Sequence, residues 1–167
     1  MSQKNLNIKV EQSASYRGKN LMWFKQSSTA QTIWDRLDEL YSYISKSGAE
    51  KTGELIFIIH AMDLETKMFN VEVYVSVDRI IASTDDFRFQ SELILENCVA
   101  AEFLGGTHQL PEAYTNIRSQ AEDLGIELTR SFCNVIKDGA DDIFDTPQIT
   151  MKIYVPLIPV DIVRLRC

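Results

Sequence analysis

The sequence predicts an α+β domain in which two pseudo-symmetric strand–helix–strand–strand units form an antiparallel sheet with two main helices and a central cleft. Two apolar stripes at helical spacing each end at a glycine, Gly48 and Gly125, which is typical of a helix terminus. Each glycine is followed by an apolar run, a loop and a strand of alternating apolar and polar residues, at 69–77 and 149–155. We expect one domain over 1–167, with a first unit at 15–78, a second unit at 92–156 and an extended tail at 157–167.

The elements of the first unit follow from the spacing of its apolar residues. Residues 1–14 are interpreted as a loose arm or a short strand at 8–10, and the apolar run in 19–25 predicts a strand. Thr29 and the two serines before it offer oxygens that can cap the following helix. The apolar positions of this helix share one face and comprise Ile33, Trp34, Leu37, Leu40, Tyr41 and Ile44. Residues 54–60 are apolar on both faces, which is typical of a strand inside a sheet.

The second unit repeats this order after a connection at 79–91. An extended segment is expected at 92–103, and Gly105 and Gly106 end it. Thr107 can cap the next helix, and Pro111 suits a first helical turn. The apolar stripe of this helix comprises Leu110, Ala113, Tyr114, Ile117, Ala121 and Leu124. Strands are predicted at 129–136 and 149–155, with an acidic loop at 137–147 between them.

Composition excludes several classes of function. The net charge is −7 and no Lys/Arg stripe is present, so binding to nucleic acid or to an anionic membrane is not expected. Cys98, Cys133 and Cys167 are widely spaced and form no CxxC pair, which favours a reducing compartment over a disulfide framework or a zinc site. No secretion signal and no apolar run of membrane-spanning length is evident. We therefore expect a cytoplasmic protein without a metal or another cofactor.

The second half of the chain resembles a known family of ligand-binding domains. The segment 106–114, then Gly125 and a strand, then Pro147 leading into 149–156, resembles the GyrI-like effector-binding domains. These are the drug-sensing modules of some bacterial transcription activators, and they also occur as stand-alone proteins. The resemblance implies two strand–helix–strand–strand units with a ligand cleft at their pseudo-dyad.

One departure from the family limits what the resemblance implies. In the drug-binding members, a glutamate on the strand after the second helix pairs with cationic ligands. The matching segment here, 131–135, contains no glutamate, so the resemblance does not imply that this chain senses cations. We also expect no attached DNA-binding domain, and therefore no control of transcription by this chain alone.

Four residues of the alternating strands are candidates for a ligand site. Phe69, Val71, Val73, Val75 and Val77 share one face of their strand, while Glu72 and Tyr74 lie on the other, as Lys152 and Tyr154 do on the last strand. If that polar face lines the cleft, Glu72 could pair with a cation and the two tyrosines could form aromatic walls. The alternatives are a face that meets water, cross-strand packing of the tyrosines, and a pair formed by Glu72 and Lys152.

These observations favour a module that binds a small amphipathic molecule and needs no chemistry. The alternative is a protein-interaction role on the same frame with a degenerate ligand site; the chain also resembles small acidic proteins of Gram-positive bacteria that are sometimes encoded near secreted-toxin clusters. An enzyme is not expected, because no GxSxG, P-loop or GxGxxG motif is present. His60 is interpreted as hydrogen-bonded packing, and His108 as exposed. The oligomeric state is open, and a homodimer is compatible with the sequence.

Overall fold

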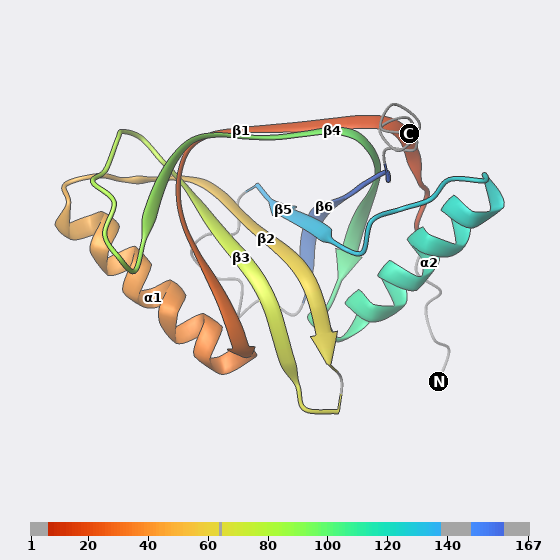
Figure 1. Ribbon diagram of the computed structural model, residues 1–167, viewed down its shortest axis with the longest axis horizontal. Helices are drawn as coiled ribbons and strands as arrows, with labels where there is room; N and C mark the ends of the chain where they lie inside the picture. The colour runs from red at the N-terminus through yellow and green to blue at the C-terminus, as the bar shows by residue number, and fades with distance from the viewer. Residues whose placement is uncertain (1–6, 64, 138–147, 159–167) are drawn as a thin grey trace, which may run out of the picture.

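The computed structural model describes residues 7–63, 65–137 and 148–158, and this part of the chain forms six strands and two main helices (Figure 1). The elements are β1 (Glu11–Thr29), α1 (Ala30–Lys46), β2 (Lys51–Asp63), β3 (Met68–Val77), β4 (Arg88–Gly105), α2 (Leu110–Asp123), β5 (Phe132–Ile136) and β6 (Ile149–Pro156). This order confirms the predicted α+β class. Residues 138–147 of the acidic loop predicted at 137–147 lie outside the described residues, as do residues 1–6, residue 64 and the tail from 159 onward.

All strand pairs are antiparallel, and the strands close into a barrel in the order β1-β3-β2-β5-β6-β4. The two long strands β1 and β4 pair with each other, and their paired parts run along the top of the view in Figure 1. The strands that follow α1 and α2 also pair with each other, β2 with β5. A duplicated unit is compatible with such an order, and duplication, with halves at 15–78 and 92–156, stays a prediction.

Helix α1 forms where the sequence predicted it. The Thr29 hydroxyl accepts a hydrogen bond from the Thr32 backbone N–H at 3.5 Å, which satisfies one of the free donors of the first turn. Gly48 follows the helix with a φ of +76°, a left-handed conformation that glycine adopts without strain. The buried face consists of Ile33, Leu37, Leu40 and Ile44, while Trp34 and Tyr41 are half-buried at its edge.

Helix α2 differs from the prediction at both ends. Thr107 does not cap it; instead Thr107–Gln109 form a 3₁₀ turn, and the Gln109 side chain accepts from the Gly106 N–H at 3.0 Å. The prediction of Leu124 in the apolar stripe is also wrong, because its side chain lies beyond the helix and is 51% exposed. The buried face is Ala113, Tyr114, Ile117 and Ala121.

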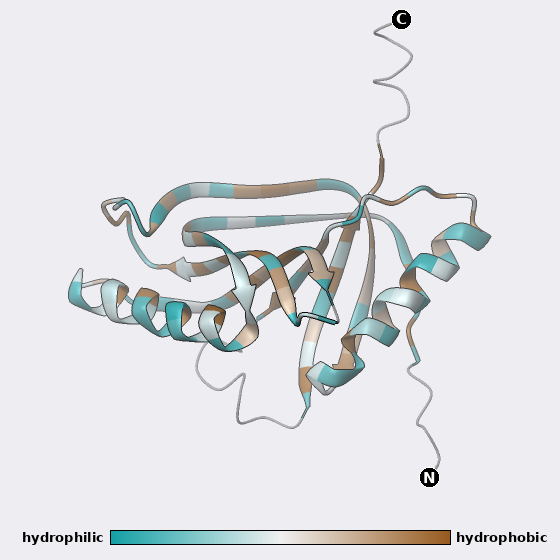
Figure 2. Ribbon diagram, turned by 60° about the horizontal axis from the view of Figure 1, so that its bottom comes forward, coloured by the Kyte–Doolittle hydropathy of each residue, from teal (hydrophilic) through white to brown (hydrophobic). Residues whose placement is uncertain are grey.

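Two hydrophobic clusters occupy opposite faces of the sheet. One joins both helices to the face of β3 that holds Val71, Val73 and Val75. The other consists of residues from all six described strands and none from the helices: Ala14, Tyr16, Leu21, Ile56, Ile58, Tyr74, Cys98, Ala100, Cys133, Val135 and Tyr154. Figure 2 shows that hydrophobic colour is concentrated in the strands, whereas both helices are largely hydrophilic. Strands buried on both faces therefore form the centre of the protein.

No helix among the described residues is both long enough and apolar enough to span a membrane. The cytoplasmic location stays a prediction. Cys98 and Cys133 are buried free thiols. The third cysteine, Cys167, lies outside the described residues.

Candidate functional site

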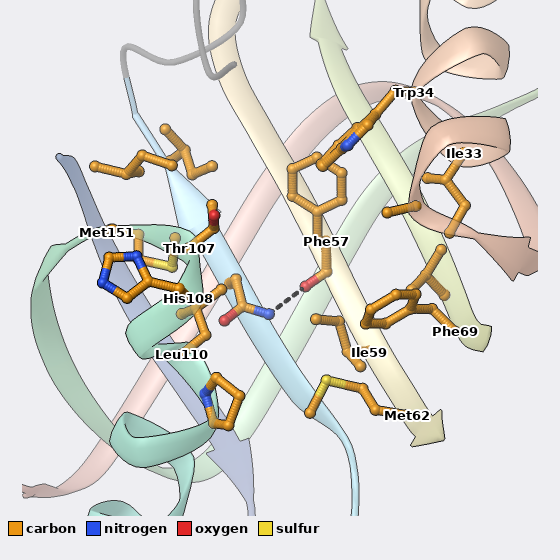
Figure 3. Close-up of a pocket in the computed structure, with 17 residues that line it drawn as sticks. Ile33, Trp34, Phe57, Ile59, Met62, Phe69, Thr107, His108, Leu110 and Met151 are labelled. Atoms are coloured by element: carbon orange, nitrogen blue, oxygen red, sulfur yellow. Dashed lines mark hydrogen bonds between the residues drawn. The ribbon is translucent and has the colours of Figure 1, made fainter. Parts of the chain in front are cut away.

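A pocket of about 590 Å³ lies on the helix-bearing face of the sheet, between the start of α1 and the start of α2 (Figure 3). The two helices lie at opposite ends of the domain, so neither covers the middle of this face (Figure 1). Phe57, Ile59, Val71, Asn134 and Met151 line the pocket from the strands, and Ile33, Trp34, His108, Leu110 and Pro111 line it from the two helical segments. Its volume falls within the range typical of small-molecule sites.

The walls of the pocket are apolar and aromatic for a reason visible in the sequence. Strand alternation puts Val71 on this face, as it does Phe57 and Ile59 of the neighbouring β2. Trp34 packs edge-to-face on Phe57, with ring centroids 5.3 Å apart and an angle of 89°. These rings give a ligand large, rigid contact surfaces.

One buried polar side chain, Asn134 of β5, belongs to the pocket lining and is only 2% exposed. Its Nδ2 donates to the carbonyl oxygens of Phe57, at 3.0 Å, and Phe132, at 3.2 Å. Its Oδ1 accepts from the Tyr114 hydroxyl at 2.6 Å. Because a carbonyl oxygen can only accept, these partners determine which end of the amide is the nitrogen. Asn134 is thereby held in one orientation.

Tyr114 is buried against the same strand, with its ring stacked on Phe132 at a centroid distance of 3.9 Å. Burial raises the pKa of its hydroxyl above the usual value, so the group stays neutral and can donate. Helix α2 thus supplies a fixed donor to the amide at the base of the pocket.

The described lining of the pocket contains no Asp, Glu, Lys or Arg. A charged ligand would therefore lose hydration there without gaining an opposite charge, which is costly. Thr107 and His108, on the turn before α2, are exposed polar residues that belong to the lining. Neutral ligands with a large apolar or aromatic part fit these properties best. The part of the chain described here also holds no group of three or more His, Cys, Asp or Glu side chains that could bind a metal ion.

The four residues predicted for the ligand site all lie on the opposite face of their strands from this pocket. Glu72 is in hydrogen-bond contact with His60, with Oε2 and Nε2 2.8 Å apart. Lys152 pairs with Glu11, with Nζ and Oε2 3.3 Å apart. Glu72 and Lys152 thus have different partners.

Tyr74 and Tyr154 belong to the cluster formed by strands alone. Tyr74 stacks on Trp23, with ring centroids 5.4 Å apart and an interplanar angle of 17°. Tyr154 contacts Tyr16, also at 5.4 Å. Both rings take part in cross-strand packing, and a ligand role for the four residues stays a prediction.

Sequence reasoning did not single out Asn134 or Ser131. Asn134 had a usable signal, since it is the one polar residue in the otherwise apolar segment 132–136. Ser131 had no such sequence signal, because only the pairing of β2 with β5 places its Oγ 2.7 Å from Nδ1 of the His60 ring. The interpretation of His60 as a hydrogen-bonded side chain agrees with its two contacts.

Comparison with known proteins finds no matching protein-family model and no matching curated protein. Solved structures do match. The C-terminal domain of EcmrR has a TM-score of 0.67 at 16% identity, covering 93% of this chain and 99% of that domain. EcmrR in a complex with DNA has a TM-score of 0.65 at 17% identity over 91% of this chain, which spans 57% of the EcmrR chain.

A hydrolase from Listeria innocua has a TM-score of 0.54 at 10% identity, covering 90% of this chain and 91% of the other. At these identities the likenesses establish the fold and nothing beyond it. The GyrI-like resemblance is therefore supported at the level of the fold. The link to toxin clusters gains no support from the comparisons.

Proposed function

We propose that this chain is a small-molecule-binding module whose ligand is a neutral, largely apolar or aromatic molecule held in the pocket between α1 and α2. The observation that supports this most directly is an open apolar pocket of about 590 Å³ whose described lining includes one fully oriented amide, that of Asn134. A side-chain cluster that served only stability would be expected to fill this space, because protein interiors are closely packed. The residues first expected to bind, Glu72, Tyr74, Lys152 and Tyr154, are not part of this proposed site.

The energetics favour a ligand with rings over a small polar one. Removing about 200 Å² of apolar ligand surface from water is worth about 5 kcal/mol before the cost of association is subtracted. The Asn134 Oδ1 can accept a second hydrogen bond beside the one from Tyr114, since a carbonyl oxygen has two lone pairs. A ligand that carries one donor, such as a phenol or an amide, could thus be selected over a pure hydrocarbon.

The structural neighbours support a sensing role without specifying it. EcmrR is seen in a complex with DNA, and its C-terminal domain matches this chain over nearly its whole length. By analogy, ligand binding to this chain would be detected by a partner or by another part of a larger assembly. The alternative of a pure protein-interaction module has no specific observation in its favour, and the hydrolase neighbour offers only a shared fold.

The test is a fluorescence titration with N-phenyl-1-naphthylamine, a neutral aromatic probe that brightens in apolar surroundings. Ala30 lines the pocket at the start of α1, and Ala30→Trp would place an indole at its edge. Ser45→Trp puts the same group on the exposed side of the same helix and is the matched control. We expect Ala30→Trp to weaken binding at least about tenfold, roughly 1.4 kcal/mol, and Ser45→Trp to leave it unchanged.

The lipophilic cation tetraphenylphosphonium tests the preference for neutral ligands. It should compete poorly with the neutral probe, because the described lining has no carboxylate. If the neutral probe fails to bind, or binds both tryptophan variants equally, the proposal is wrong. If the cation displaces the probe at a lower concentration than a neutral aromatic competitor of similar size, the preference for a neutral ligand is wrong.

A further inference from the structure

A second chemical arrangement lies on the face of the sheet opposite the pocket. His60 is near the end of β2, where the register shifts: Ile59 pairs with Val71 and Ala61 with Asn70, so His60 is an extra residue without a partner in β3. Such irregularities redirect side chains and are frequent beside functional sites. The ring of His60 contacts one side chain on each neighbouring segment, Glu72 of β3 and Ser131 just before β5.

The two ring nitrogens of His60 have different partners. Nδ1 is 2.7 Å from Oγ of Ser131, the residue before β5, and Nε2 is 2.8 Å from Oε2 of Glu72 on β3. An ionised carboxylate can only accept, so in the neutral form of the ring the proton is on Nε2 and is donated to Glu72. Nδ1 is then the unprotonated acceptor, and the Ser131 hydroxyl donates to it. This is the proton arrangement in which a base activates a nucleophile and a carboxylate orients the base.

The cluster formed by His60, Glu72 and Ser131 is partly buried but accessible to solvent. The side chain of His60 is 32% exposed and that of Glu72 is 20% exposed, and Ser131 is half-buried. The three residues belong to separate segments that the antiparallel pairing of β2 with β3 and β5 holds side by side. Glu72 lies on a paired strand, and His60 and Ser131 each adjoin the paired residues Ile59 and Phe132, so the sheet fixes the backbone on which all three side chains stand.

We propose that Ser131 is a nucleophile activated by His60, with Glu72 as the residue that positions the ring, and that this site transfers the acyl group of activated esters. Ser131 Oγ attacks the ester carbonyl carbon while its proton passes to Nδ1, and the resulting imidazolium is stabilised by Glu72. Collapse of the tetrahedral species breaks the bond to the alcohol or phenol, which takes the proton from Nδ1. Water then attacks the acyl-serine with Nδ1 as base, and the carboxylic acid and free Ser131 are formed.

This proposal does not depend on the pocket, because the two sites use opposite faces of the sheet. The pocket can bind a ligand whether or not Ser131 reacts, and the two proposals can fail separately. The site also requires no cofactor, since the three side chains and water supply every atom and proton of the reaction.

The experiment uses the full chain and 4-nitrophenyl acetate. The rate is measured as release of nitrophenolate, and peptide mass mapping locates the acetyl group on the protein. We expect wild-type protein to be acetylated at Ser131. Ser131→Ala and His60→Ala should each lower the initial rate on the order of 100-fold, the usual contribution of a positioned base. Ser91→Ala, which removes an exposed serine of β4, should have no effect.

Glu72→Gln tests the positioning role, because it keeps the size of the side chain and removes its charge. The rate should fall about tenfold while the thermal unfolding midpoint changes little, and Glu72→Asp should restore part of the rate. A purely structural cluster would show the reverse pattern: lower unfolding midpoints and no selective acetylation of Ser131. Acetyl groups found only on lysines, or a wild-type rate equal to that of Ser131→Ala, would overturn the proposal.

Discussion

Replacing Asn134 by aspartate tests the base of the pocket, because the two side chains have the same shape and differ in donors and charge. The variant loses both Nδ2 hydrogen bonds to the carbonyl oxygens of Phe57 and Phe132. In its protonated form the new carboxyl group can donate to one of those oxygens, so at pH 4 the expected loss of unfolding free energy is about 1 kcal/mol. An ionised carboxylate would instead face two carbonyl oxygens in a site where residue 134 is 2% exposed.

Burial of this kind raises the pKa of a carboxyl group, and a shift of about two pKa units corresponds to about 2.7 kcal/mol. The folded-state pKa then lies above the unfolded one, so the variant is most stable at low pH and loses stability as pH rises from about 4 towards neutrality. At pH 7 we expect a total loss of about 4 kcal/mol relative to the parent protein at the same pH, the sum of the lost hydrogen bond and the pKa shift.

Urea unfolding followed by far-ultraviolet circular dichroism at pH 4 and pH 7 measures this difference. Asn97→Asp is the control, because Asn97 is exposed and its left-handed backbone, with a φ of 53°, tolerates aspartate. The control should change stability by less than about 0.5 kcal/mol at either pH. An Asn134→Asp variant that is no less stable at pH 7 than at pH 4, relative to its parent, would show that the amide is not held as the structure indicates.

Three further predictions concern stability and thiol reactivity. Tyr114→Phe should lower the free energy of unfolding in urea by about 1–3 kcal/mol, because it leaves a buried acceptor with one donor fewer. Tyr43→Phe removes an exposed hydrogen bond to a loop carbonyl and should cost less than about 1 kcal/mol. Equal effects would contradict the buried contact. Leu40→Ala should lower the free energy of unfolding by about 2–5 kcal/mol, because this side chain is fully buried. Leu124→Ala should change it by no more than about 0.5 kcal/mol, and a large effect of Leu124→Ala in the same assay would argue against the exposure of Leu124. Burial raises the pKa of the Cys98 thiol from 9.0 to about 11, so the stability that this group contributes below pH 9 should be lost between pH 9 and 11. Alkylation of Cys98 by iodoacetamide at pH 8 should be far slower in folded than in urea-unfolded protein, and equal rates would contradict its burial.

Most of the fold could be predicted from local patterns, because helices and strands bury stripes with different periods. The face of α1 that holds Leu37 and Leu40 and the alternation in 69–77 led directly to the observed elements. Strand β1 was underestimated, since its first half, 11–18, is mostly polar and is extended because β4 pairs with it. The buried positions of this half alternate, but they hold Ala14, Tyr16 and Gly18, of which only Tyr16 is large, so the alternation is weak in the sequence.

The candidate site was less predictable than the fold. The sequence showed that β3 has a valine face and a face with Glu72 and Tyr74, and it was natural to assign the second face to a ligand. In the structure both faces are buried, with Val73 at 0% exposure and Tyr74 at 4%. The pocket lies on the valine face because both helices pack there and their ends leave the middle of that face uncovered.

The sequence by itself determined the α+β class, the two helices and the alternating strands, since each of these depends on residues close together in the chain. Only the tertiary structure decided which face of the sheet receives the helices, that Asn134 meets Tyr114, and that His60 lies between Glu72 and Ser131. Those contacts join residues from 12 to 71 positions apart. Strand alternation is compatible with either face being covered, and the choice depends on how the whole barrel closes and where its helices can bury their apolar stripes.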